Sequence, residues 1–130
     1  MSVPTDRQRL GQRGERLAKQ FLASHGYVIE EANARFPVGE IDLIAREGET
    51  LCFVEVRSTA SVDWGGSLGS IGERKRRRLI RAARWYVQRL RRLPPEMRFD
   101  VVAIDWLPDG TSSIELVRGA FEAAKTQNVW

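Results

Sequence analysis

The sequence has very few of the residues that anchor sulfur and imidazole chemistry. Among its 130 residues there is one cysteine, Cys52, and one histidine, His25. A lone cysteine forms no internal disulfide, and one cysteine with one histidine is too few for a zinc site. A Ser-His-Asp triad has no support either. We interpret His25 as structural, because it follows the first expected helix, where the helix dipole favours a cation.

Long apolar runs are missing as well. No run approaches the roughly 18 residues that a membrane-spanning helix needs, and the polar segment Met1 to Gln8 lacks the apolar stretch of a secretory signal. The glycines at positions 65, 66, 69 and 72 match neither the Walker pattern nor the dinucleotide fingerprint. We therefore expect a cytoplasmic protein that does not associate with membranes and has no nucleotide-phosphate loop.

What is present is the composition of an ordinary folded domain, with 42% hydrophobic and 29% charged residues. The patterns predict, in order, a helix over 5–24, strands over 27–36, 40–46 and 51–57, a helix from an S-x-x-E capping box at Ser70 to Pro94, strands over 99–106 and 113–117, and a closing helix over 120–127. We expect residues 1–130 to form one α/β domain. Residues 1–5 are expected to be flexible, and the Ser- and Gly-rich segment 58–69 to be a mobile loop.

Acidic residues are absent from one segment of the chain. Ten of the 21 Lys and Arg residues lie between Arg74 and Arg92, with no Asp or Glu among them. Helical spacing places apolar residues on one face of this segment and basic residues on another. A basic face suits nucleic-acid phosphates, although a solvated helix face remains an alternative. The candidate nucleic-acid contacts are Arg74, Arg77, Arg78, Arg81 and Arg84.

The second and third expected strands form a hairpin with a defined register. Gly48-Glu49 is expected as a type II′ turn, because glycine suits the first central position of that turn. Residues whose numbers sum to 97 then face each other, which places Asp42 opposite Glu55. The other face of the hairpin is uniformly apolar and is expected to line a core; it consists of Ile41, Leu43, Ala45, Cys52, Val54 and Val56.

Two carboxylates at opposed positions of a hairpin call for a positive charge between them. Directly opposed side chains have Cβ atoms about 5 Å apart, where like charges are destabilising. Oxygen ligands suit Mg²⁺ or Mn²⁺, and such an ion activates water and stabilises charge on a phosphodiester under attack. The residues alone leave an alternative open, in which Asp42 and Glu55 are solvated and paired with nearby bases such as Arg57.

The strings Gly39-Glu40-Ile41-Asp42-Leu43-Ile44 and Phe53-Val54-Glu55-Val56-Arg57 resemble the D…E-x-K signature of the PD-(D/E)XK nuclease superfamily. More closely, the chain resembles the bacterial YraN-like family of uncharacterised proteins, which is related to Holliday-junction resolvases. The resemblance spans Gly14 to Ile104. It implies a restriction-endonuclease-like three-layer fold, in which helices flank a mixed central sheet with an α-β-β-β-α-β core. Other matching stretches are Gly14-Glu15, Asn33-x-Arg35, Lys75 with the apolar helix after it, and Arg98 to Val102.

The resemblance also implies a ligand set for a divalent Mg or Mn ion. Asp42 and Glu55 are its expected catalytic ligands, and the backbone carbonyl of Val56 a third contributor. Glu15 matches the helical glutamate of the resolvase-like members, although it also fits a surface glutamate. Because resolvases reach two scissile phosphates symmetrically, the resemblance implies a homodimer.

The sequence departs from the superfamily signature at Arg57, where lysine is usual. Arginine stays protonated and cannot be a base, so Arg57 is expected to hold phosphate and leave water activation to the metal. Lys75 is in line with the apolar stripe of its helix, points toward the sheet, and is a candidate for the missing ammonium. A surface lysine in a basic run is the alternative.

Two more residues have open interpretations. Trp64, within the Gly-rich loop, is a candidate for stacking on a nucleic-acid base, and packing between protein copies explains it equally well. Asp100 opens a buried strand, where a hydrogen bond or ion pair with Arg98 is preferred over metal binding.

Three functions remain in competition. The leading one is a metal-dependent nuclease that acts on structured or branched nucleic acid, with DNA favoured over RNA. The second is a binding module with the same fold that has lost cleavage, as Arg57 permits. The third is a protein-interaction subunit whose basic helix meets an acidic partner.

Overall fold

The structure of this protein is a computed structural model, which describes residues 6–60 and 71–123. This part of the chain contains two helices and five strands in the order expected from the sequence. The elements are α1 (Asp6–Ser24), β1 (Tyr27–Phe36), β2 (Gly39–Glu47), β3 (Thr50–Thr59), α2 (Glu73–Val87), β4 (Glu96–Trp106) and β5 (Ser112–Phe121). No helix among the described residues is both long enough and apolar enough to cross a membrane.

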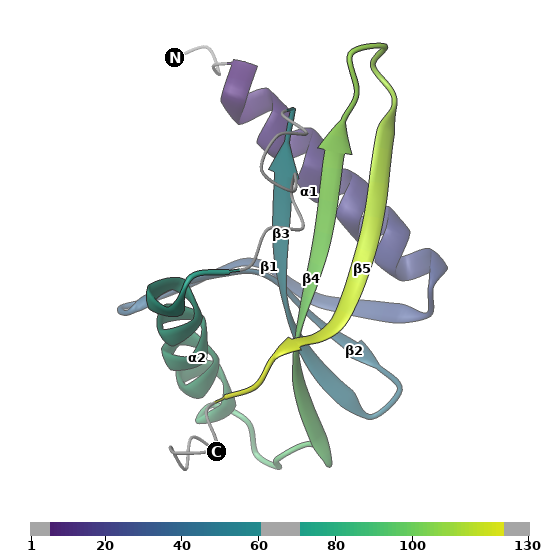
Figure 1. Cartoon of the computed structure of the whole chain (residues 1–130). Coiled ribbons are helices and arrows are strands. Elements are labelled where there is room, and N and C mark those ends of the chain that lie inside the picture. The colour runs from purple at the N-terminus through teal and green to yellow at the C-terminus, as the bar shows by residue number, and fades with distance from the viewer. Residues whose placement is uncertain (1–5, 61–70, 124–130) are drawn as a thin grey trace, which may run out of the picture.

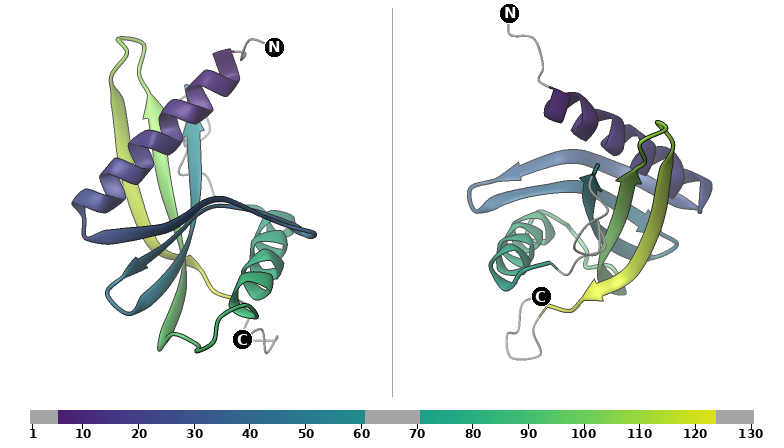
Figure 2. Two further views of the ribbon diagram at one scale, coloured as in Figure 1. Left: turned by 180° about the vertical axis from the view of Figure 1, so that it is seen from behind. Right: turned by 45° about the horizontal axis from the view of Figure 1, so that its top comes forward.

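The five strands form one mixed sheet in the order β1-β2-β3-β4-β5. Neighbouring strands are antiparallel except β3 and β4, which pair in parallel and are connected through the segment that includes α2. Helices α1 and α2 lie on opposite faces of the sheet (Figures 1 and 2). The protein is therefore a three-layer α/β domain, as expected.

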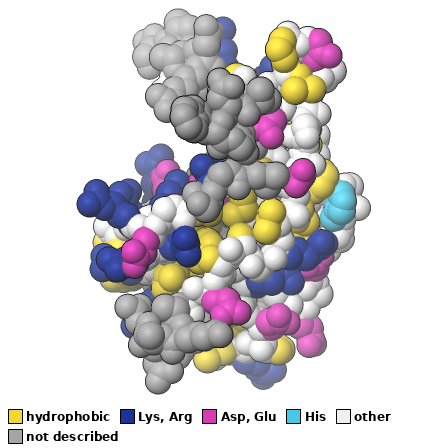
Figure 3. All heavy atoms as spheres, viewed as in Figure 1, with side chains coloured by type: hydrophobic (Ala, Val, Ile, Leu, Met, Phe, Trp, Pro, Cys, Tyr) yellow, Lys and Arg dark blue, Asp and Glu magenta, His cyan; other side chains and the backbone are white. Residues whose placement is uncertain are grey.

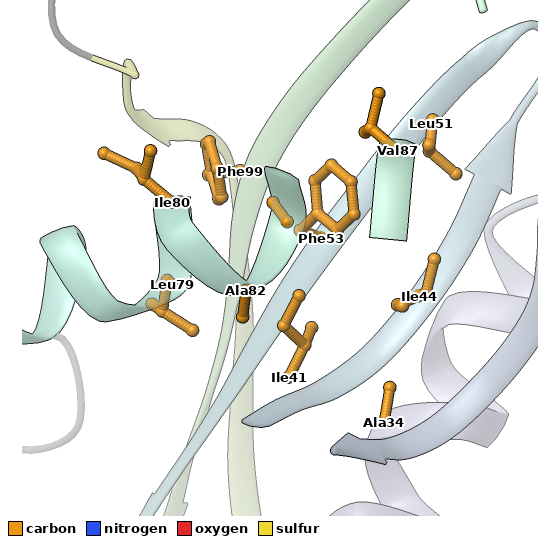
Figure 4. Packing of buried hydrophobic residues seen from close by; sticks show 11 residues of the cluster. Ala34, Ile41, Ile44, Leu51, Phe53, Leu79, Ile80, Ala82, Val87 and Phe99 are labelled. Carbon is orange, nitrogen blue, oxygen red and sulfur yellow. The ribbon is translucent and has the colours of Figure 1, made fainter. Parts of the chain in front are cut away.

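Each helix covers its own apolar core. Helix α2 packs through Leu79, Ala82 and Val87 on a cluster that includes Phe53 and Phe99 (Figure 4). On the other face, α1 packs on a second cluster of buried residues: Ala18, Leu22, Tyr27, Leu43, Ala45, Cys52, Val54, Val102, Ile104 and Trp106. Strand β4 is buried throughout its middle, as the continuous apolar run predicted.

The β2–β3 hairpin has the predicted register. Its pairs run from Glu47 with Thr50 to Leu43 with Val54, so the residue numbers sum to 97. Gly48 has a positive φ of 61°. Since Asn33 is the one residue other than glycine with positive φ in the described chain, Glu49 has a negative φ, as a type II′ turn requires.

One prediction for this hairpin is wrong. Ile41 was expected on the face of Leu43 and Ala45, but it packs with Ile44 in the cluster beneath α2. The strict alternation of faces fails between Ile41 and Leu43, just beyond the last pair of the β2–β3 ladder. The neighbouring strand β1 is irregular as well: it has a register shift between Ile29 and Glu31 and a left-handed residue, Asn33, and such irregularities increase the local twist.

Helix α2 is shorter than predicted at both ends. It begins at Glu73, after an N-cap at Gly72 that has no side-chain capping bond; Ser70, the first residue of the predicted capping box, lies outside the described residues. Glu73 pairs with Arg77, at 2.7 Å. The helix ends at Val87, well before Pro94. Beyond it the backbone amides of residues 89 and 90 donate hydrogen bonds to the third preceding carbonyl, which tightens the chain into turns.

The predicted loop and closing helix also need correction. Residues 58 and 59 belong to β3, because Ser58 and Thr59 extend the parallel pairing with β4; residues 61–70 lie outside the described chain. Residues 120–121 continue β5 rather than starting a helix. Phe121 pairs with Phe99 and its ring stacks 4.6 Å away, while residues 124–127 and 1–5 lie outside the described chain.

A buried ion-pair network joins four strands at the end of the sheet away from the carboxylate pair. Asp100 is 1% exposed and accepts hydrogen bonds from Arg98 Nε at 2.8 Å, from the Tyr27 hydroxyl at 2.8 Å and from the Gly119 amide at 2.9 Å. Arg98 Nη2 also donates to Glu47 Oε1 at 2.6 Å. The structural interpretation of Asp100 is therefore confirmed.

Candidate metal and phosphate site

Asp42 lies on β2 just beyond the last pair of the β2–β3 ladder. Its Oδ2 accepts a hydrogen bond from the Val56 backbone amide at 2.9 Å, which ties the carboxylate to β3. Burial, and next the negative charge of Glu55, raise the pKa of Asp42 to about 7. The Val56 amide and the Lys75 ammonium oppose this rise. The predicted pairing of Asp42 directly opposite Glu55 is not part of the ladder, which ends at Leu43 and Val54, but the two carboxylates are close enough to interact electrostatically.

Glu55, on β3, is the buried member of the pair, with 8% of its surface exposed. Its Oε1 lies 2.9 Å from Lys75 Nζ, which comes from the first turn of α2. The prediction that Lys75 points toward the sheet is therefore correct. The ammonium offsets part of the cost of burying a carboxylate, because a buried charge needs a partner of opposite sign.

A cavity of about 630 Å³ opens beside Asp42, on the side of the sheet that α1 covers. Its walls come from α1 and from strands β1 to β3, and its lining is Gln8, Gly11, Gln12, Glu15, Asn33, Glu40, Asp42, Val56 and Ser58. The cavity therefore connects the carboxylate at Asp42 with a polar face of α1. The described lining holds no Lys or Arg.

Glu15 reaches this cavity from α1. Its Oε1 accepts a hydrogen bond from Asn33 Nδ2 at 2.8 Å, and Lys19 Nζ lies 3.5 Å from the same oxygen. Glu15 also contributes to the raised pKa of Asp42. Glu15 therefore approaches the sheet near Asp42, as expected. Its contacts with Asn33 and Lys19 are not those of a freely solvated surface glutamate.

Helix α1 comes very close to the sheet at Gly14. A Cβ atom built on Gly14 would lie 3.2 Å from Ser58 Oγ and 3.3 Å from Ser58 Cβ. Ser58 Oγ in turn accepts a hydrogen bond from Trp106 Nε1 at 2.7 Å. The absence of a side chain at Gly14 therefore lets α1 approach β3 and carry the neighbouring Glu15 to the cavity.

The donor set of this site fits a divalent cation. Asp42 and Glu55 supply carboxylate oxygens and Val56 supplies a carbonyl, which are the ligands that Mg²⁺ and Mn²⁺ prefer. Burial, and next the charge of Glu55, raise the pKa of Asp42, and a cation beside the two carboxylates would oppose both effects. Within residues 6–60 and 71–123, however, no three Asp, Glu, His or Cys side chains gather into a metal-sized group. Glu15 would therefore act through water or from a distance.

Arg57 follows two residues after Glu55 on β3 and is half-buried. It is registered with Ala103 of the parallel strand β4. A guanidinium at this place supplies a fixed positive charge, and it cannot accept a proton from water at neutral pH. Its expected role in holding phosphate stays a prediction.

The basic face of α2 is exposed, as the helical spacing predicted. Figure 3 shows Lys and Arg side chains gathered at the left of the molecule, where α2 lies. Arg77 is partly neutralised by Glu73. Trp64, proposed for stacking, lies outside the described residues. The exposed arginines of the predicted set are Arg74, Arg77, Arg78, Arg81 and Arg84.

The sequence interpretation missed two residues of the site. Asn33 bonds to Glu15 and adopts a φ of 52°, a left-handed conformation that asparagine tolerates better than most residues. Ser58 lines the cavity and receives the Trp106 indole, although it was assigned to a loop. An asparagine within a strand pattern was the one local signal for Asn33; nothing local marked Ser58.

The sequence matches one family of known proteins over most of its length. Residues 14–104 match the model of a family described as "Uncharacterised protein family UPF0102". A UPF0102 protein of Desulfosudis oleivorans is 42% identical over 117 residues, which cover 90% of this chain and 93% of the relative. One of Symbiobacterium thermophilum is 43% identical over 116 residues, with 89% and 98% coverage. One of Anaeromyxobacter sp. is 41% identical over 125 residues, with 96% and 93% coverage.

Proposed function

The chain belongs to the UPF0102 family, the YraN-like family that the sequence resembles, and we propose that it is a metal-dependent nuclease of restriction-endonuclease-like fold. In this proposal it hydrolyses phosphodiester bonds in structured or branched nucleic acid, DNA in preference to RNA, with Mg²⁺ or Mn²⁺. The three-layer α/β architecture and the mixed sheet are compatible with that fold.

One observation carries the proposal. A buried glutamate on β3 and an aspartate on β2 are close enough for the charge of Glu55 to raise the pKa of Asp42. A carboxylate with a strongly raised pKa beside a polar cavity, as Asp42 is, marks a candidate functional site. Here the pair lies where β2 and β3 stop pairing, with a cavity on one side and an ammonium on the other.

The residues have distinct roles in the proposed reaction. Asp42, Glu55 and the Val56 carbonyl would hold the ion, with Glu15 at the far side of the cavity. A bound divalent ion supplies Lewis-acid stabilisation of phosphate charge and lowers the pKa of water. Arg57 and Lys75 position the phosphate and stabilise its charge. The basic face of α2 holds the neighbouring phosphates.

The cleavage test compares branched, single-stranded and duplex DNA in Mg²⁺ or Mn²⁺. We expect wild type to cut at least one of these substrates, and the variants Asp42→Asn and Glu55→Gln to lose activity at least a hundredfold. Glu115→Gln is the matched control, because Glu115 is an exposed carboxylate on β5. Cleavage that persists unchanged in both site variants would come from a contaminant, and it would refute the proposal that this protein is a nuclease.

Metal binding is tested separately by titrating Mn²⁺ into the protein in a calorimeter. Wild type should bind one ion, and Asp42→Asn should bind at least tenfold more weakly. Lys75→Met should bind Mn²⁺ more tightly than wild type, because the ammonium at 2.9 Å competes with the ion for Glu55. The same variant should cut more slowly, because it lacks a phosphate contact. Arg74→Gln is the charge-matched control, and an unchanged Mn²⁺ affinity in Lys75→Met would contradict the competition.

A second candidate is a nucleic-acid-binding module that has lost cleavage. Two observations favour it: Arg57 stands where the superfamily usually has lysine, and no third acidic side chain completes a compact ligand group among the described residues. This candidate predicts nucleic-acid binding that weakens steeply with salt and needs no divalent ion. Cleavage that disappears in Asp42→Asn would exclude it.

We also propose a homodimer, by analogy with nucleases that reach two scissile phosphates of a branched substrate. Light scattering on the free protein and on its complex with a four-way junction checks this. A mass of one chain in both states would contradict the dimer and leave the cleavage proposal untouched.

A further inference from the structure

Trp85, near the end of α2, is an exposed aromatic side chain whose position the core does not explain. It is 42% exposed, and within the described chain its indole has neither a hydrogen bond nor a ring contact. A single exposed apolar residue is common on protein surfaces. The neighbours of Trp85 are what make its position informative.

Those neighbours are arginines in line with Trp85. Arg74, Arg78, Arg81 and Trp85 are spaced by four, three and four residues, and this spacing places them on one stripe of a helix. All are exposed. Arg74, Arg78 and Arg81 form no salt bridge with any described residue, and the segment from Arg74 to Arg92 contains no acidic residue. We call these four residues the α2 stripe.

The α2 stripe begins beside the proposed site. Lys75, the neighbour of Arg74, contacts Glu55. Trp85 lies ten positions after Lys75, which at 1.5 Å per residue is about 15 Å along the helix. A strand of a few nucleotides that follows the stripe would therefore place one phosphate near the carboxylates while a base a few nucleotides away reaches the indole.

We propose that the α2 stripe binds unpaired nucleotides, with Trp85 as the stacking platform and the three arginines as phosphate contacts. The proposal rests on the nuclease or binding function proposed above and names its substrate class: nucleic acid with a single-stranded segment. The three arginines alone would bind duplex and single-stranded nucleic acid alike, because both contain phosphates. A flat indole on a convex helix gains stacking energy only from a base that is not paired and stacked within a duplex.

The test separates bases from phosphates in the ligand. Fluorescence anisotropy in EDTA measures the affinity for an oligothymidylate and for an abasic oligonucleotide of the same length, which carries the same phosphates. Wild type should prefer the oligothymidylate by about fivefold to a hundredfold, the range expected for stacking one base on an aromatic residue. A duplex of equal length should bind no more tightly than the abasic strand, when the affinity for the duplex is counted per strand.

Variants assign the preference to Trp85. Trp85→Leu should abolish the preference and keep the salt dependence, while Trp85→Phe should retain much of the preference. Arg81→Gln should weaken both ligands alike and reduce the salt slope by about one. Leu93→Ala, which alters an exposed apolar residue outside the stripe, should change nothing. Urea unfolding of each variant controls for folding.

Three outcomes overturn the proposal: equal affinity for thymidylate and abasic strands, a preference that survives in Trp85→Leu, or no nucleic-acid binding at all. The last outcome would point to an acidic protein partner for α2. Because the assay contains no divalent ion, the result is independent of cleavage. A base preference without cleavage would refute the nuclease alone, and cleavage without a base preference would refute the α2 stripe alone.

Discussion

Two glycines of α1 that look alike in the sequence should respond in opposite ways to replacement by alanine. Gly11 and Gly14 both lie within the helix, where alanine is preferred over glycine by about 0.5–1 kcal/mol. A Cβ on Gly11 would meet nothing within 4 Å. Gly11→Ala should therefore raise the free energy of unfolding by about 0.5–1 kcal/mol.

Gly14→Ala brings a cost that exceeds this gain. Its Cβ would lie 3.2 Å from Ser58 Oγ, 3.3 Å from Ser58 Cβ and 3.6 Å from Ile104 Cδ1. Ser58 cannot easily retreat, because its strand pairs with Ile104 of β4 and its hydroxyl holds the Trp106 indole. Overpacking of this kind costs about 1–3 kcal/mol. After the helix gain is subtracted, we expect a net loss of about 1–2 kcal/mol.

Urea unfolding followed by far-ultraviolet circular dichroism measures both variants against wild type. The two alanine variants should differ by about 2 kcal/mol in free energy of unfolding, with wild type between them. Gly14→Ala should also bind Mn²⁺ more weakly, because α1 carries Glu15 toward the cavity. If Gly14→Ala is as stable as Gly11→Ala, the close approach of α1 to β3 is refuted.

Three further predictions concern ionisable groups, and urea unfolding checks each of them. In EDTA, wild type should lose stability relative to Asp42→Asn as the pH rises from about 4 to 7, because the folded protein raises the pKa of Asp42 from 3.8 to about 7 and so binds the extra proton; a stability difference that stays constant over this interval would contradict this. Contacts with Arg118 and Arg98 lower the pKa of Glu47 from 4.5 to about 2, so its contribution is complete above about pH 4.5 and is lost as the pH falls toward 2. The stability difference between wild type and Glu47→Gln should accordingly shrink over that interval, and a constant difference would count against it. Asp100→Asn should cost about 3–5 kcal/mol at neutral pH, because it weakens a buried ion pair with Arg98; a cost below about 1 kcal/mol would show that the network contributes little.

The hairpin that carries the carboxylates was predictable because its signals are local. The turn at Gly48 depends on the conformational freedom of one glycine, and the register follows from counting outward from that turn. Counting alone did not place Asp42 relative to Glu55, because the ladder ends at Leu43 and Val54 and the alternation of faces fails just beyond that pair. The direction of Lys75 was likewise predictable, because its position relative to the apolar stripe of α2 indicates which way its side chain points.

The errors arose where distant residues override a local pattern. The segment at 120–121 has a helical pattern, but the stacking of Phe121 on Phe99 extends β5 instead. Ile41 lies on the face opposite to the one that alternation predicts, just beyond the point where β2 stops pairing with β3. No pattern within β2 itself records where that pairing ends.

Local patterns along the chain thus establish the order of elements, the α/β class, the hairpin register and the basic outer face of α2. These properties depend on side-chain periodicity and turn chemistry, which act over a few residues. Tertiary packing alone decides that Asn33 holds Glu15, that Gly14 lets α1 reach Ser58, and that a cavity opens beside Asp42. Each of these contacts joins residues that lie far apart in the sequence, so it exists only once the sheet has brought them together.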